Sequence, residues 1–141
     1  MGNVAKAKNR KSVSERHLQL ALRDNITCLE AGLKISDGGT EQVVKYDGVA
    51  NPGRIDITAK DKKGATVVIE LKSGRVGRRA IGQILGYMGA LMRLKNKKRI
   101  RGILVAEEFS PQGMAAARPV PSLELRRLSS LPSKLLTHLA Y

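Results

Sequence analysis

The spacing of apolar and polar positions predicts two long helices. Leucine and isoleucine recur at three- and four-residue steps early in the chain, which is the spacing of one helix face. These residues are Leu18, Leu22, Ile26, Leu29 and Leu33. We expect this helix to run from an N-cap at Ser14 to about Gly32. The same spacing predicts a second helix over 78–94, with an apolar face made of Ile81, Ile84, Leu85, Met88, Leu91 and Met92.

Short aliphatic and β-branched runs predict the strands. These runs are residues 41–46, 54–60, 66–72, 101–106 and 123–128. A turn is expected at residues 37–39, a hairpin loop at 61–65, and short helices at 111–117 and 132–140. The order of elements predicts one α/β domain over residues 14–141, a mixed β-sheet core flanked by helices, preceded by a basic flexible arm, residues 1–13.

Charge points to a polyanionic partner. The 141 residues carry 26 Lys+Arg against 12 Asp+Glu, a formal net charge of +14, and Arg93–Arg101 alone holds six basic residues. Nucleic acid is the first candidate. An anionic membrane surface is disfavoured because no helix pairs a basic face with a Trp/Phe-rich one, and no apolar run approaches the roughly 18 residues of a membrane span. One cysteine, Cys28, favours a reducing setting, so we expect a cytoplasmic or nucleoid-associated protein.

The predicted hairpin brings two acidic residues together. If its loop is symmetric about Lys63, Asp56 lies opposite Glu70 and Arg54 lies opposite Lys72. Cβ atoms of opposed residues are about 4.5–5.5 Å apart, where like charges repel, so a surface salt-bridge cluster leaves the pair unexplained. Alternation places an apolar set on the other face, expected to be the core. That set is Ile55, Ile57, Val67, Ile69 and Leu71.

A divalent cation would remove the repulsion between Asp56 and Glu70. Carboxylate oxygens from neighbouring strands suit Mg²⁺, which accepts substrate phosphate oxygens as well. The metal would activate a water as nucleophile, and Lys72 could orient that water, help deprotonate it, or stabilise charge on phosphorus.

The same residues resemble a known nuclease signature. Asp56, thirteen residues and then Glu70-Leu71-Lys72 are similar to the D…(D/E)xK motif of the PD-(D/E)xK superfamily, although Ile55 stands where its name has proline. The stretch Gly53–Leu91 resembles the catalytic domain of the NucS (EndoMS) family of mismatch and branched-DNA endonucleases, and RGILVAEEF and LELRRL fit that pattern. NucS proteins carry a further N-terminal DNA-binding and dimerising domain, for which only the arm stands here. Archaeal and phage Holliday-junction resolvases are similar too.

The resemblance implies a restriction-endonuclease-like fold and specific roles. Asp56, Glu70 and Glu15 would be metal ligands for Mg²⁺ (Mn²⁺ possible), with Lys72 and Gln83 also catalytic. Independently of the resemblance, Arg79, Gln83 and Tyr87 are spaced four apart as a polar stripe of the second helix. Glu15 could instead be an ordinary acidic residue of a first helical turn, and Gln83 and Tyr87 ordinary groove-lining residues.

The function expected is a Mg²⁺-dependent endonuclease that hydrolyses phosphodiester bonds of branched or mismatched duplex DNA, as a homodimer. A dedicated Holliday-junction resolvase and a non-catalytic DNA-binding module that retains the fold are the alternatives. The residues expected to contact DNA are Arg54, Arg75, Arg78, Arg79, Tyr87, Lys95, Lys97, Lys98 and Arg99.

Overall fold

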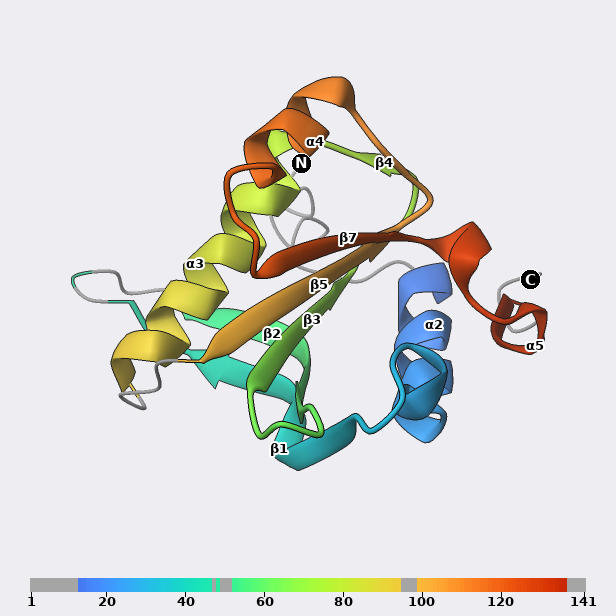
Figure 1. The fold of residues 1–141 in the computed structure, drawn as a ribbon, viewed down its shortest axis with the longest axis horizontal. Coiled ribbons are helices and arrows are strands. Elements are labelled where there is room, and N and C mark those ends of the chain that lie inside the picture. Colours follow the sequence, from blue (N-terminus) through green and yellow to red (C-terminus); the bar gives the residue numbers. More distant parts are fainter. Residues whose placement is uncertain (1–12, 47, 49–51, 95–98, 137–141) are drawn as a thin grey trace, which may run out of the picture.

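A mixed five-stranded sheet forms the centre of the protein (Figure 1). The computed structural model describes residues 13–46, 48, 52–94 and 99–136. The strand order is β1-β2-β3-β5-β7, with β1 to β3 antiparallel and β5 and β7 parallel to β3. The strands are β1 (Lys34–Val44), β2 (Gly53–Lys60), β3 (Thr66–Leu71), β5 (Ile100–Ala106) and β7 (Leu123–Arg127). The predicted fold class, a mixed sheet flanked by helices, is confirmed.

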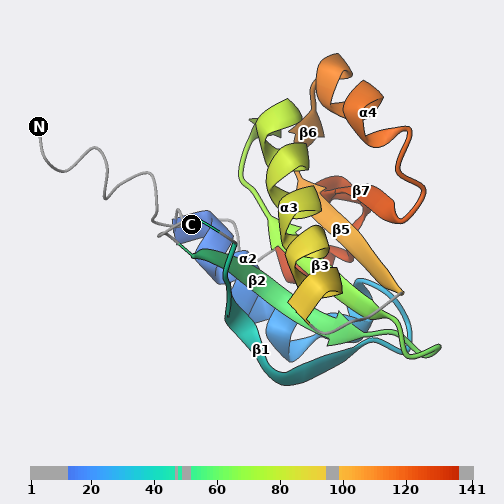
Figure 2. The same cartoon turned by 90° about the vertical axis from the view of Figure 1, so that its left-hand side faces the viewer.

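Helices cover both faces of the sheet (Figure 2). Helices α3 (Arg78–Leu94) and α4 (Pro111–Ala117) pack over one face, and α2 (Val13–Asp24) and α5 (Ser133–Leu136) pack over the other. Each face therefore has its own apolar core. The prediction of a single core face on the hairpin is wrong, because Ile55 packs on the α3 side and Ile57 on the α2 side. Within the described residues, no helix has the length and hydropathy needed to cross a membrane.

The first helix is shorter than its apolar pattern predicts. It ends at Asp24, and a 3₁₀ turn, η1 (Ile26–Cys28), follows. The side-chain amide of Asn25 donates to the carbonyl of Ala21 at 3.0 Å, and Asn25 has a φ of −140°. Polar side chains that bond nearby backbone compete with helical conformation, which explains the early end.

The turn predicted at residues 37–39 lies inside β1. Pairing with β2 shifts between Ile35 and Thr40, so that five steps along β1 match only two along β2. The extra residues form a bulge, in which Gly38 has a φ of +66°. A Cβ at Gly39 would meet the carbonyl oxygen of Thr58 at 2.3 Å. Two adjacent glycines thus let the strand continue through what looked like a turn.

Most later elements lie where the sequence predicts them. Helices α3 and α4 match residues 78–94 and 111–117, although Met92 is 46% exposed and not part of the buried face. A small parallel pair, β4 (Arg75–Val76) and β6 (Glu108–Phe109), was not predicted. The arm up to residue 12, residues 137–140 of the predicted last helix, and residue 141 lie outside the described residues.

Candidate active site

Asp56 and Glu70 lie where the β2–β3 ladder stops. The ladder runs from Lys60 opposite Thr66 to Ile57 opposite Ile69, which is the register predicted from a symmetric loop. One step further, the backbone N–H of Asp56 donates to Glu70 Oε1 at 2.9 Å. The N–H of Leu71 donates in turn to Asp56 Oδ2 at 2.8 Å. The two carboxylates therefore hold each other's strands in place of backbone pairing.

Both carboxylates are buried. Asp56 is 4% exposed and Glu70 is 2% exposed. Burial is the main cause that raises the pKa of Tyr46, and the negative charge of Glu70 raises it further. Burial and the charge of Glu70 also raise the pKa of Tyr87, with a smaller effect of Asp56. Two buried, hydrogen-bonded carboxylates from adjacent strands are a hard oxygen donor set, so Asp56 and Glu70 fit a Mg²⁺ ion by their chemistry.

Lys72 and Glu15 lie at the same end of the hairpin, although they belong to different parts of the chain. Lys72 follows β3 and donates its backbone N–H to the carbonyl of Val105 at 2.9 Å. The next residue, Ser73, donates its N–H and its hydroxyl to Glu15 Oε1 at 2.8 and 3.0 Å. Glu15 is thus tied to the residue after Lys72. The described part of the chain holds no group of three or more His, Cys, Asp or Glu arranged for a metal, so the role of Glu15 as a ligand stays a prediction.

Gln19 was not predicted to belong to the site. It lies one turn after Glu15 on α2, is 3% exposed, and donates its side-chain amide to the carbonyl of Asp56 at 3.0 Å. The available signal was a polar residue four positions after an acidic one, beside the apolar stripe.

Tyr87, which was predicted to contact DNA from the polar stripe of the second helix, is buried in the structure. It is 6% exposed. Burial is the main cause that raises the pKa of Tyr87, to about 12, and an interaction with the backbone of Arg54 partly opposes the rise in the pKa of its hydroxyl. A Cβ at Gly53 would lie 2.4 Å from the Tyr87 ring, so this glycine lets the ring approach β2. Tyr87 therefore packs against the start of β2, and Gln83 of the same helix is exposed.

The predicted DNA-contacting arginines are exposed wherever the structure describes them. This set comprises Arg54, Arg75, Arg78, Arg79 and Arg99. The predicted contacts Lys95, Lys97 and Lys98 lie outside the described residues.

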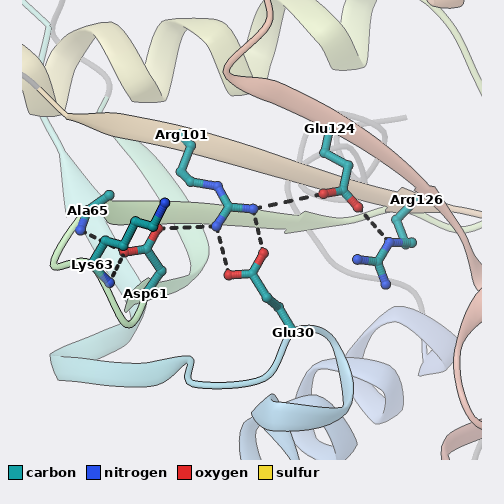
Figure 3. Close-up of polar contacts among 7 residues, drawn as sticks. All are labelled: Glu30, Asp61, Lys63, Ala65, Arg101, Glu124 and Arg126. Atoms are coloured by element: carbon teal, nitrogen blue, oxygen red, sulfur yellow. Dashed lines mark hydrogen bonds and ion pairs between the residues drawn. The ribbon is translucent and has the colours of Figure 1, made fainter.

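Arg101, the last cation of the basic run, is part of an ion-pair cluster (Figure 3). It binds Glu30 through two hydrogen bonds of 2.7 and 2.6 Å, and Asp61 through one of 3.3 Å. Hydrogen bonding to Arg101 lowers the pKa of Glu30, and raises that of Arg101 itself. The pKa of Asp61 is lowered as well: burial opposes this shift, and hydrogen bonds from the Ala65 backbone and Arg101 outweigh it. Arg101 is therefore paired within the protein, whereas Arg99 of the same run is exposed.

The fold is similar to that of a repair endonuclease and to that of EndoMS. A repair endonuclease from Pyrococcus abyssi matches with a TM-score of 0.69 and 26% identity, over 84% of this chain and 48% of that one. EndoMS in a complex with double-stranded DNA matches with a TM-score of 0.67 and 27% identity, over 84% and 46%.

The family follows from the sequence comparison. The model of the endonuclease NucS C-terminal domain matches residues 14–135, and the chain belongs to this family. Endonuclease NucS of Kocuria rhizophila is 32% identical over 104 residues, which is 74% of this chain. That of Streptomyces coelicolor is 29% identical over 73% of this chain. The chain spans only 41% and 42% of these two relatives. The predicted resemblance to NucS is confirmed.

Proposed function

We propose that this chain is the catalytic unit of a Mg²⁺-dependent DNA endonuclease, with Mn²⁺ as a substitute. The observation that carries the proposal is the reciprocal bonding of Asp56 and Glu70 at the end of the hairpin, with Lys72 two residues further. A surface salt bridge needs neither burial nor backbone capping of both acids. Membership of the NucS C-terminal domain family supports the same chemistry.

The residues divide the work of phosphodiester hydrolysis. Asp56 and Glu70 would hold the metal, which when bound polarises the phosphate and activates the attacking water. Lys72 would orient that water, help deprotonate it, or stabilise charge on phosphorus. Glu15 and Gln83 would act from α2 and α3, Glu15 as a further ligand and Gln83 beside the scissile phosphate.

Duplex DNA is the proposed substrate, in branched or mismatched form. The exposed arginines offer non-specific phosphate contacts, and the structural match to EndoMS in a DNA complex supports this choice. A homodimer would supply two active sites for two strands. A DNA substrate is consistent with the expected cytoplasmic or nucleoid-associated location. A dedicated Holliday-junction resolvase is the alternative within the same chemistry.

A cleavage assay with matched variants tests the proposal. Glu70→Gln removes the charge but keeps an oxygen that can accept the Asp56 N–H, so the fold should persist. The control is Glu108→Gln, an exposed acid on β6. We expect Glu70→Gln to lose Mg²⁺-dependent cleavage while binding DNA at low salt, and Glu108→Gln to cut normally. Undiminished cleavage by Glu70→Gln would refute this assignment of the active site. DNA binding without cleavage by the wild type would favour the DNA-binding module.

The preferred DNA structure needs a separate comparison. Four-way junction, mismatch, flap and plain duplex would each be offered with Mg²⁺, and initial nicking rates compared. Fastest nicking of the mismatch or flap supports the NucS-like substrate, whereas strong preference for the four-way junction supports the resolvase.

A further inference from the structure

Helix α2 is bonded to both strands that carry the candidate catalytic residues. Gln19 donates to the carbonyl of Asp56 on β2, and Glu15 accepts from Ser73 just after β3. These two residues are four apart, so they lie on one face of the helix. The β2–β3 ladder runs only as far as Ile57 opposite Ile69. The helix thus bridges the two strands beyond the point where their pairing stops.

Burial of Gln19 lowers the stability of the fold, because one of its polar atoms has no hydrogen-bond partner among the described residues. It is 3% exposed, and its Oε1 finds no hydrogen-bond partner within the described part of the chain. A buried acceptor without a partner is unfavourable. An apolar side chain of the same length, such as methionine, would fill the space without that cost. Packing therefore does not explain a glutamine, whereas its bond to Asp56 does.

The contact acts on the backbone that aims the Asp56 carboxylate. The carbonyl of Asp56 is held by Gln19, its N–H by Glu70 Oε1, and its Oδ2 by the N–H of Leu71. With both backbone groups fixed, the direction of the side chain is set before any ligand arrives. Outer groups that orient metal ligands commonly change metal affinity or activity by about 10–100-fold.

We propose that Gln19 is a positioning residue, which sets the geometry of the Asp56–Glu70 pair through the Asp56 carbonyl. This proposal rests on the proposed function for its effect on cleavage, but the effect on the Asp56 backbone is independent of it.

The test compares Gln19→Met with Leu18→Met. Leu18 is the preceding residue of α2 and is 2% exposed, so the control alters an equally buried side chain away from Asp56. Three quantities are measured: thermal stability, amide hydrogen exchange at Asp56 and Leu71, and single-turnover DNA cleavage against Mn²⁺ concentration.

For Gln19→Met we expect a melting temperature close to wild type, because the change removes the unpaired Oε1 and, in the opposite direction, the donor to the Asp56 carbonyl. Exchange at the Asp56 and Leu71 amides should be faster than in Leu18→Met. Cleavage should slow by about 10–100-fold, with more Mn²⁺ needed and DNA affinity unchanged. If amide exchange is faster in Gln19→Met but the wild type itself cuts no DNA, the proposed function is refuted and the positioning role is supported.

Two results would overturn the positioning role. One is amide exchange in Gln19→Met equal to that in Leu18→Met. The other is a fall in cleavage accounted for by global unfolding. If Gln19→Met does not fold, Gln19→Glu keeps the shape and replaces the donor by an acceptor. Its exchange at the same two amides then decides: faster exchange supports the role, and unchanged exchange overturns it.

Discussion

Arg101 and Arg99 should behave as different kinds of residue although both belong to the basic run. Arg101 is held by Glu30 and Asp61, whereas Arg99 is exposed. Replacing each by methionine removes one positive charge and keeps an aliphatic side chain. We expect Arg101→Met to lower stability without changing DNA affinity. We expect Arg99→Met to lower DNA affinity without changing stability.

The size of the effect at Arg101 follows from its partial burial. The side chains of Arg101 and Glu30 are 26% and 28% exposed, and that of Asp61 is 10% exposed. Breaking a buried pair costs about 3–5 kcal/mol and a surface pair about 0–1 kcal/mol, so we expect about 2 kcal/mol. At about 2.1 cal/mol/K per residue, this lowers the melting temperature by roughly 7 °C.

The pH dependence gives a second measure of the same contact. The pKa values of Glu30 and Asp61 are lowered in the folded protein, from ordinary values of 4.5 and 3.8. Their contribution is complete above those ordinary values and is lost as pH falls through the lowered folded ones. Arg101→Met should therefore lose less stability than wild type on acidification.

Urea unfolding at neutral and acid pH, with DNA binding at two salt concentrations, measures all of these effects. Equal stability of Arg101→Met and wild type would refute the structural role. The distinction between the two arginines would also be refuted if Arg101→Met lowered DNA affinity or its salt dependence as much as Arg99→Met does.

Two further changes test the contact between α3 and β2. Tyr87→Phe removes the buried hydroxyl that interacts with the Arg54 backbone, and should cost about 1 kcal/mol in urea unfolding. Because the pKa of Tyr87 is about 12, the loss should be equal at neutral and mildly alkaline pH. Gly53→Ala places a Cβ 2.4 Å from the Tyr87 ring and should cost about 1–3 kcal/mol. Gly82→Ala, with nothing within 4 Å, should gain about 0.5–1 kcal/mol, and equal effects of the two alanines would contradict the described packing.

Local chemistry made the hairpin predictable. Its loop is closed by Asp61, whose carboxylate accepts the N–H groups of Lys63 and Ala65. That loop fixes the register, and the register brings Asp56 beside Glu70. Both steps depend on residues close in the sequence, so the pairing of Asp56 with Glu70 could be predicted from the sequence.

Contacts between distant segments were not predictable in the same way. The bond from Gln19 to Asp56 spans 37 positions, and that from Arg101 to Glu30 spans 71. Periodicity shows that a helix has an apolar face, but not which strand its polar residues meet. The burial of Tyr87 was missed for this reason, since it depends on the absence of a side chain at Gly53.

Metal binding by Asp56 and Glu70 is the central claim, and calorimetric titration with Mn²⁺ measures it most directly. The wild type would be compared with Asp56→Asn and Glu70→Gln, which retain oxygens for the Leu71 and Asp56 N–H groups. The account predicts binding by the folded wild type and at least about tenfold weaker binding by each variant. Equal Mn²⁺ affinity in all three proteins would contradict it.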